Sequence, residues 1–401
     1  MNLVLAKIIG VMQIVIYSVI LNNHQVHIAD ELWHLTGGQF FFIELENLSG
    51  DNKKGSVVDY SKRPYLLKSW ESQEAYNRAM ELAKMADCCI FSGVSALPFQ
   101  KERMKLDLLS FDMSERWLKR GIINIFSPTI FKMFLAYHRG GWNKKQIYKL
   151  CCGAFVASDQ RRLGTYRGKC YKWGYFINAE EKIIKASLMV PTSKVISLMW
   201  CSRYLTLKHP ELPILMARRL KDAGYQFMLD MYGEGDLKME AIELVRTLKI
   251  DDVVCFHNNI PNSDLLQEMK KHEIFLFTSD RNEGWGVVAN ESMANGCALI
   301  ASDAIGSVPY LVKDKYNGLI CRSSKVSCSF KNPDMDAVDS LYQNVEWLLQ
   351  HVKERRMIQQ NAIKTMCNLW SPQNAALALL ELIKNINNKD FTIKEGPCSM
   401  A

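Results

Sequence analysis

The sequence has little of what builds linkers, disulfide frameworks or metal sites. Its 401 residues include 11 prolines and 22 glycines, which leaves no room for a long low-complexity linker. The 12 cysteines show no CxxC spacing, and no histidine cluster at metal-ligand spacing accompanies them. Two cysteine pairs, 88–89 and 151–152, are direct neighbours, and such pairs rarely bridge each other. Free thiols in a reducing compartment are the simpler interpretation, and they favour the cytoplasm.

The overall composition is that of an ordinary folded protein. Hydrophobic residues make up 48% and charged residues 23%, which excludes disorder, collagen-like repeats and a polytopic membrane bundle. The length suggests two or three globular units. No internal repeat is visible at the periods of solenoid proteins.

Positive charge is concentrated in the first half of the chain. Residues 1–190 hold 26 basic and 17 acidic side chains, whereas residues 191–401 hold 24 and 25. Residues 101–185 alone hold 18 basic and 7 acidic side chains. An anionic partner should therefore meet this half: a membrane surface, a phosphate-bearing substrate or nucleic acid. A solvated basic surface is the simpler alternative.

The N-terminus carries an apolar run over residues 3–21, broken by Lys7, Gly10 and Gln13. It is nearly long enough to span a membrane, but no signal-peptide cleavage site follows it. Residues 13–21 are rich in β-branched residues and end at a polar turn, which favours a buried first strand of a parallel sheet over a membrane anchor. Residues 1–11 are then an extension before that strand.

Apolar and amphipathic segments alternate in both halves, which indicates two doubly wound parallel α/β units. Expected strands cover residues 13–21, 40–45, 88–91, 154–157, 195–199, 227–232, 253–256, 274–277 and 298–301. Expected helices cover residues 26–35, 72–85, 114–120, 129–138, 212–223, 236–248, 262–271, 286–295, 335–350, 353–368 and 371–386. Ligands of such sheets bind outside the carboxyl ends of the strands, so a cleft between two facing units is the expected site.

The segment 279–296 carries the strongest chemical signal. It follows an expected strand, and two glycines, Gly284 and Gly286, allow tight backbone geometry before a helix begins. Backbone N–H groups there would suit a phosphate or sugar oxygen. Glu283 precedes Glu291 by eight residues, a little over two helical turns, so the two carboxylates could contact different ends of one ligand. Alternatively, both are ordinary surface or helix-end glutamates.

These two glutamates match the Glu-x7-Glu motif of retaining, two-domain (GT-B) glycosyltransferases of family four. The segments 304–312 and 316–320 resemble the glycine-containing segments that follow this motif in the family. Arg203 and Lys208 resemble its R-x4-K pair, and residues 233–235 resemble its glycine turn. The match runs in order from about residue 195 to 386. The resemblance implies the GT-B fold: two Rossmann-like domains that face across a cleft, with a C-terminal helix returning toward the N-terminal domain.

The resemblance also implies roles for single residues. Arg203 and Lys208 would grip the donor diphosphate, Glu283 would position the donor sugar and Glu291 would hold the nucleotide ribose. The catalytic candidates are thus Glu283, Arg203 and Lys208. The donor-binding candidates are Arg203, Lys208, Gly233, Glu283, Gly284, Trp285, Gly286, Val287 and Glu291.

The N-terminal half resembles bacterial family members that build surface polysaccharides, and in the family this half binds the acceptor. The sequence departs from the family where Asn22-Asn23 replaces a common glycine pair. Residues 172–176 look like the start of the interdomain connection. The acceptor-side candidates are Asn22, Asn23, His24, Ser92 and Asp159.

The expected activity is retaining transfer of a sugar from a UDP- or GDP-linked donor to a glycan or polyprenyl-diphosphate-linked acceptor. No D-x-D motif follows a strand, so no metal and no further cofactor are expected. No nucleic acid is expected either, because the basic half lacks interleaved aromatic residues and zinc spacing. The alternatives are a GT-B sugar-nucleotide epimerase and a non-catalytic basic scaffold or nucleic-acid-binding protein.

The resemblance implies that the basic half of the chain binds peripherally to the anionic inner face of the membrane. The candidates within residues 101–185 are Lys101, Arg103, Lys105, Lys119, Arg120, Lys144 and Lys145, with Trp117 and Trp142 as interfacial anchors. The expected domain boundaries are an acceptor domain over 1–175, a connection over 176–194, a donor domain over 195–370, a crossover helix over 371–386 and a loose tail over 387–401.

Overall fold

The computed structural model describes residues 12–47, 58–179 and 195–401. The chain divides into two compact units. The first comprises residues 1–176 and 370–401, and the second comprises residues 177–369. The expected extension 1–11 and most of the expected connection 176–194 lie outside the described residues.

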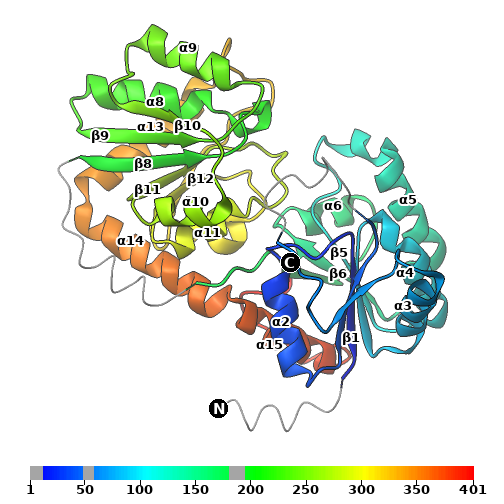
Figure 1. Ribbon diagram of the computed structural model, residues 1–401. Helices are drawn as coiled ribbons and strands as arrows, with labels where there is room; N and C mark the ends of the chain where they lie inside the picture. Colours follow the sequence, from blue (N-terminus) through cyan, green and yellow to red (C-terminus); the bar gives the residue numbers. More distant parts are fainter. Residues whose placement is uncertain (1–11, 48–57, 180–194) are drawn as a thin grey trace. The chain divides into compact units, whose positions relative to one another are not determined.

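The first unit contains a seven-stranded parallel sheet in the order β3-β2-β1-β4-β5-β6-β7 (Figure 1). Its strands are β1 (Ile14–Ser18), β2 (Phe40–Glu44), β3 (Leu66–Lys68), β4 (Cys88–Ser92), β5 (Ser110–Ser114), β6 (Ile147–Cys152) and β7 (Cys170–Trp173). Its helices are α2 (Val26–Leu35), α3 (Gln73–Met85), α4 (Leu97–Leu106), α5 (Pro128–Ala136), α6 (Val156–Arg162) and α15 (Pro372–Asn385), with short helical turns η2 (Val94–Ala96), η3 (Ile122–Phe126) and η4 (Tyr137–Gly141).

The N-terminal apolar run supplies the buried strand β1. Every residue of β1 is buried, and the strand pairs with β2 on one side and β4 on the other. The β-branched residues of this strand suit a position that is covered on both faces. Among the described residues, no helix is long and apolar enough to cross a membrane.

Two expectations about the first unit are wrong. Residues 114–120 form no helix, and residues 154–157 form no strand, because α6 begins at Val156. The strand instead lies at β6, where Lys149 interrupts an otherwise apolar segment. Lys149 is fully buried and forms an ion pair of 3.1 Å with Asp112, its register partner on β5. Because Lys149 and Asp112 interrupt the apolar residues of β6 and β5, neither strand is recognisable from its hydrophobicity pattern.

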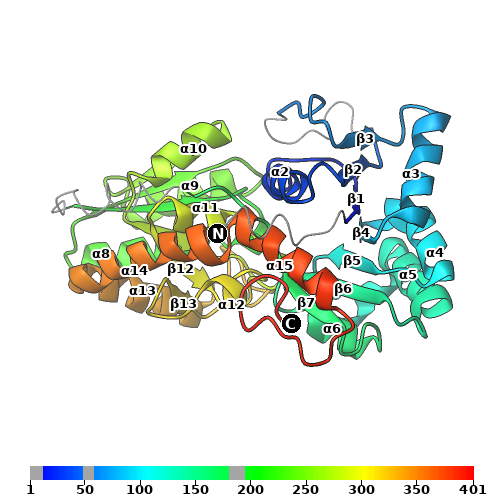
Figure 2. The ribbon, with the colours of Figure 1, turned by 90° about the horizontal axis from the view of Figure 1, so that it is seen from below.

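Helices cover both faces of this sheet. Helices α3 and α4 pack on one face through residues such as Leu82 and Phe99, which meet Val15 and Tyr17 of β1. Helices α2 and α15 lie together on the other face, as Figures 1 and 2 show. The C-terminal helix therefore returns to the N-terminal unit, as expected from the sequence.

The C-terminal tail is not loose as expected. Its last residues run beside β7: Lys172 N donates to Ser399 O at 2.8 Å, and Ala401 N donates to Cys170 O at 3.0 Å. Cys398 is buried. The polar composition of the tail conceals these backbone hydrogen bonds, since they do not depend on side chains.

The second unit contains a six-stranded parallel sheet in the order β10-β9-β8-β11-β12-β13. Its strands are β8 (Ile196–Cys201), β9 (Phe227–Tyr232), β10 (Val254–His257), β11 (Ile274–Phe277), β12 (Ala298–Ser302) and β13 (Leu319–Cys321). Its helices are α8 (Glu211–Asp222), α9 (Lys238–Leu248), α10 (Asn262–Met269), α11 (Val288–Ala294), α12 (Val308–Leu311), α13 (Met335–Gln350) and α14 (Val352–Lys364), with short turns η5 (Thr206–Lys208) and η6 (Thr365–Leu369).

Alternate residues of these strands face two helical layers. Leu198, Leu229 and Leu276 pack with α8, α9 and α13 in one continuous core. Helices α11 and α14 pack against β12 and against each other. The two parallel sheets agree with the fold class expected from the sequence.

Candidate active site

Loops after four strands of the second unit meet at one edge of its sheet. The strands β8, β9, β11 and β12 are parallel, so their carboxyl ends share that edge. The loop after β8 carries Arg203 and Lys208, the loop after β9 carries Gly233, and the loop after β11 carries Glu283. The sequence-predicted donor residues therefore gather where ligands of such sheets bind.

The central contact of this edge is an ion pair between Lys208 and Glu283. Lys208 Nζ contacts Glu283 Oε2, and the two side chains are 13% and 16% exposed. Ser279 Oγ donates a second hydrogen bond of 3.0 Å to the same carboxylate oxygen. The sequence predicts separate partners for these residues, the diphosphate for one and the sugar for the other, yet the structure places them together.

Hydrogen bonds hold the two loops of this pair in register. Thr278 Oγ1 donates to Lys208 O at 2.7 Å, and it accepts from Trp200 Nε1 at 3.0 Å. Asp280 N donates to Leu207 O at 2.9 Å. Because these bonds fix the backbone beside both charged groups, the pair rests on a rigid frame.

A buried histidine strengthens this frame. His209 Nδ1 lies 2.7 Å from Glu211 Oε1, and its Nε2 lies 3.5 Å from Asp280 Oδ2. Burial alone would lower the pKa of His209, but the carboxylates of Asp280 and Glu211 outweigh it and raise that pKa to about 9. With this pKa, His209, the residue that follows Lys208, carries a positive charge at neutral pH. The sequence analysis missed this cluster, although the acidic residue two positions after His209 is a visible signal.

Arg203 is exposed, and its guanidinium forms no ion pair within the described part of the chain. The glycine turn after β9 shapes its loop. A Cβ added at Gly233 would lie 1.9 Å from Ser202 O, and one at Gly235 would lie 2.6 Å from Tyr204 O. Only glycine allows this approach. Gly233 therefore positions the arginine loop, which gives the predicted glycine a structural reason.

Two glycines allow the loop after β11 to pack tightly. Gly286 has φ 79°, and a Cβ there would lie 2.3 Å from Phe277 Cζ. A Cβ at Gly306 would lie 1.7 Å from Gly284 O, and Gly306 follows β12. Ser307 N donates to Trp285 O at 3.2 Å. The loop after β12 therefore packs directly against the loop that carries Glu283 and restricts its position.

Trp285 does not present its side chain to a ligand. It is fully buried, and its Nε1 donates to Asn290 Oδ1 at 2.9 Å. The indole packs inside the unit, so the expected donor contact of Trp285 would have to come from its backbone. Helix α11 begins at Val288, two residues later than expected, so Gly286 and Val287 belong to the loop.

Glu291 lies on α11 and is 6% exposed. Its Oε1 accepts a hydrogen bond of 3.3 Å from Asn262 Nδ2, the first residue of α10. Burial raises the pKa of Glu291 to about 7, and the bond from Asn262 opposes this only in part. Hydroxyl groups that donate to this buried carboxylate would stabilise its ionised form. The ribose contact expected from the sequence would supply such groups. Sequence reasoning missed Asn262, and no signal in the sequence marks it.

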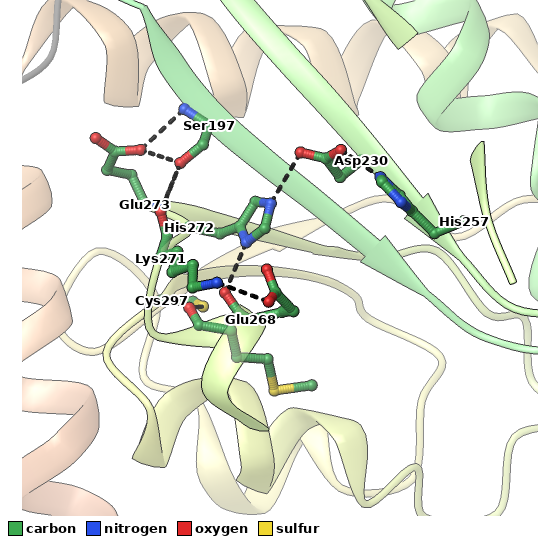
Figure 3. A network of polar contacts seen from close by, with 9 residues as sticks. Ser197, Asp230, His257, Glu268, Lys271, His272, Glu273 and Cys297 are labelled. Carbon is green, nitrogen blue, oxygen red and sulfur yellow. Dashed lines mark hydrogen bonds and ion pairs between the residues drawn. The ribbon is translucent and has the colours of Figure 1, made fainter. Parts of the chain in front are cut away.

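Helix α10 is anchored at its other end by the network in Figure 3. Asp230 Oδ2 lies 3.0 Å from His272 Nε2, and its Oδ1 lies 2.6 Å from His257 Nε2. His272 Nδ1 donates to Glu268 O at 2.8 Å. Burial would raise the pKa of Asp230, but the hydrogen bonds from the two histidines lower it overall. The network fixes the helix that presents Asn262 to Glu291.

The acceptor-side candidates lie in the first unit and differ in burial and in their hydrogen-bond partners. Asn22 Oδ1 accepts from His24 N at 3.0 Å, and Asn23 Oδ1 accepts from Tyr60 OH at 2.7 Å. The ring of His24 lies 5.9 Å from that of Tyr175, and burial, followed by the charge of His27, lowers its pKa. Ser92 is half-buried at the end of β4.

Asp159 is a structural residue. It is fully buried, pairs with Arg116 at 3.1 Å and accepts from Leu118 N at 2.9 Å. An acceptor would have to displace both partners, so Asp159 is not available for the acceptor contact expected from the sequence.

Two of the expected membrane-contact residues are also internal. Arg103 is fully buried and donates to the carbonyl oxygens of Ala83 and Ala86 at 3.1 and 2.6 Å, and Trp117 is 2% exposed. Neither can reach a membrane. Trp142, by contrast, is 50% exposed.

The cysteines and acidic residues suggest no other centre. All 12 cysteines are free thiols. Within residues 12–47, 58–179 and 195–401, no group of three His, Cys, Asp or Glu side chains is placed to hold a metal ion.

Comparison with known proteins gives the family. Residues 181–365 match the family model of the glycosyl transferases group 1. The second unit is a group 1 glycosyltransferase domain. This match confirms, for the second unit, the glycosyltransferase family expected from the sequence.

Solved structures agree on the fold. HepE of Anabaena, crystallised with UDP, is 13% identical with a TM-score of 0.67, and the alignment covers 93% of this chain and all of that one. Sucrose-phosphate synthase of Thermosynechococcus elongatus is 15% identical with a TM-score of 0.65, covering 94% and 99%. The lipopolysaccharide outer core galactosyltransferase WaaB is 15% identical with a TM-score of 0.62, covering 94% and 98%. No curated protein matches the sequence.

Proposed function

We propose that the glycosyltransferase moves a sugar from a UDP- or GDP-linked donor to a glycan or lipid-linked glycan, with retention of the anomeric configuration. We place the reaction in the synthesis of an exopolysaccharide, capsule or lipopolysaccharide. The observation that carries the proposal is the ion pair between Lys208 and Glu283, beside an exposed Arg203 and a buried Glu291 on the same sheet edge.

The charges at this edge suit the departure of a nucleoside diphosphate. When the bond between the sugar and the diphosphate breaks, negative charge grows on the phosphate while the sugar becomes oxocarbenium-like. Arg203 offers a bidentate fork and Lys208 a point charge to those phosphate oxygens. Fixed positive groups of this kind lower the barrier because they need no reorganisation during the reaction.

The Lys208–Glu283 pair also gives Glu283 a defined task. With its carboxylate held by Lys208 and Ser279, Glu283 is a poor nucleophile but a well-placed hydrogen-bond acceptor. We assign it to the hydroxyl groups of the donor sugar, and we assign Glu291 to the ribose hydroxyls. No general base is assigned; the acceptor hydroxyl attacks from the side of the leaving diphosphate, which itself takes the proton.

The relatives support the donor and product classes. HepE is described with UDP and with UDP-glucose, and WaaB is a galactosyltransferase of the lipopolysaccharide outer core. We assign the acceptor to the first unit and include Asn22, Asn23, His24 and Ser92 among its contacts. Free thiols throughout the chain favour a cytoplasmic enzyme. Exposed basic residues between 101 and 185 favour peripheral contact with the inner membrane face.

The test is a transfer assay with UDP-glucose, UDP-galactose and GDP-mannose, each combined with a polyprenyl-diphosphate-linked monosaccharide. We expect one donor to release its nucleotide only when the acceptor is present, and NMR of the product to show the anomer of the donor. Lys208→Ala should slow turnover about 100- to 1,000-fold, whereas Lys331→Ala, at an exposed lysine of the same unit, should leave it unchanged. An inverted product would refute retention. Conversion of the donor into a sugar isomer without acceptor would establish the epimerase alternative.

A further inference from the structure

A cavity of about 590 Å³ lies in the first unit beside α4, α5 and η4. Its volume falls within the range of roughly 300–1,000 Å³ that small-molecule sites occupy. None of the donor or acceptor candidates lines it. The lining combines apolar groups with cations: Leu97, Met104, Leu135, Ala136 and Gly140 on one hand, and Lys101, Lys105, Lys132, Arg139 and Lys144 on the other.

The helical repeat explains how the sequence forms this lining. Positions 97, 101, 104 and 105 share one face of α4, because they are three or four residues apart. Positions 132, 135, 136 and 139 share one face of α5 and its continuation into η4. Gly140 then allows close approach, since a Cβ there would lie 3.3 Å from Met104 Sδ. Each helix thus contributes apolar groups and cations to the same space.

The cations of this cavity are largely uncompensated. Lys105 pairs with Glu102 at 2.5 Å. Lys101, Lys132, Arg139 and Lys144 form no ion pair with a carboxylate in the described part of the chain, and the first three are exposed. Like charges around an apolar space repel one another without an anion. A purely apolar ligand would leave this repulsion in place, and a free anion would leave the apolar lining unused.

Exposed apolar side chains continue from the cavity along the same elements. Ile122, Ile123 and Phe126 of η3 are 59%, 73% and 78% exposed, and η3 packs on α5. Phe131 on α5 and Trp142 after η4 are 44% and 50% exposed. Large apolar groups interleaved with cations are typical of a surface that rests on an anionic bilayer.

We propose that this cavity binds one anionic membrane lipid, with a hydrocarbon chain against Leu135 and Met104 and the phosphate among Lys101, Lys132, Arg139 and Lys144. The charge complementarity and the apolar floor together select this occupant. The proposal rests on the peripheral membrane contact proposed above and gives that contact a specific lipid site. It does not depend on the donor site of the second unit.

The first experiment uses monomeric ligands below their micelle concentrations. Dodecyl phosphate, dodecyl maltoside and inorganic phosphate are titrated into the full chain by calorimetry. We expect dodecyl phosphate to bind one to one and at least 10-fold more tightly than either of the others. Equal binding of dodecyl maltoside would reduce the site to an apolar crevice, and equal binding of inorganic phosphate would reduce it to an anion site; either result overturns the proposal.

Variants then separate the two parts of the site. Leu135→Trp fills the cavity from a half-buried position, and Lys101, Lys132, Arg139 and Lys144 are together changed to Gln to remove the charge. Each variant should weaken dodecyl phosphate binding at least 10-fold and reduce flotation with vesicles of phosphatidylglycerol and phosphatidylcholine. A matched control changes four exposed lysines elsewhere to Gln, namely Lys325, Lys331, Lys353 and Lys389.

UDP affinity, measured in parallel, should be the same in all these proteins. That readout confirms folding and separates this proposal from the proposed function, since loss of lipid binding with intact UDP binding would leave the donor site untouched. Unchanged lipid binding in Leu135→Trp, or an equal loss in the control, would refute the lipid site.

Discussion

The buried side chain of Glu291 gives the sharpest prediction: once its carboxyl ionises, it should lower the stability of the folded protein. Glu291 is 6% exposed, and burial raises its pKa from an ordinary 4.5 to about 7. A carboxyl with a raised folded-state pKa binds its proton more tightly in the folded than in the unfolded protein. The stability that this proton confers is complete below pH 4.5 and is lost as the pH rises through about 7.

The magnitude follows from the shift. At about 1.4 kcal/mol per pKa unit, ionised Glu291 costs the fold on the order of 3 kcal/mol at pH 8. Glu291→Gln keeps the shape and the bond to Asn262 but cannot ionise. For a unit the size of residues 177–369, 1 kcal/mol corresponds to a Tm change of about 2–4 °C. The variant should therefore melt roughly 6–12 °C above the wild type at pH 8.

The assay is thermal melting of wild type and Glu291→Gln between pH 4.5 and 8. The difference in Tm should be near zero at pH 4.5 and grow with pH, and the variant should bind UDP or GDP more weakly. Glu240→Gln, an exposed glutamate on α9, serves as the control and should show no such trend. A variant that melts at or below the wild type at pH 8 would refute the argument from burial.

Lys208→Ala should lower kcat about 100- to 1,000-fold with a smaller change in KM, because the charge acts on the departing diphosphate; a change confined to KM would contradict this. Gly306→Ala places a Cβ 1.7 Å from Gly284 O. The variant should therefore lose about 1–3 kcal/mol of unfolding free energy in denaturant titrations and bind the nucleotide more weakly. Wild-type stability and affinity would show that the loop can move aside without cost. His209 has a pKa raised to about 9, so its stabilising charge is complete below pH 6.5 and is lost as the pH rises through 9. Melting of His209→Gln should lack this decline, and a decline equal to that of the wild type would assign it to other groups.

The sequence predicts the second unit well because its strands are mostly apolar and alternate regularly with amphipathic helices. Segments such as 227–232 and 274–277 coincide with β9 and β11. The donor-site residues also fall on neighbouring loops, since parallel strands deliver their carboxyl ends to one edge.

The first unit is harder to predict because it buries charge. Lys149 and Asp112 neutralise each other across β5 and β6, and a pattern of hydrophobicity cannot show such a pair. Arg103 similarly looks like a surface residue in sequence, yet backbone carbonyls surround it. The partners of Glu283 and Glu291 were missed for a related reason: Lys208 lies 75 residues and Asn262 29 residues away in sequence, so only the fold brings each pair together.

The central claim is that the carboxyl edge of the second sheet holds a nucleoside diphosphate through Arg203. Calorimetric titration of UDP and GDP into wild type, Arg203→Ala and Arg246→Ala tests it most directly, because Arg246 is an exposed arginine on α9. Hydrogen bonds to charged groups contribute about 1.5–3 kcal/mol, so Arg203→Ala should weaken one nucleotide roughly 10- to 150-fold while Arg246→Ala binds as the wild type does. Equal affinity in all three proteins, or no binding of either nucleotide to the wild type, would contradict the account.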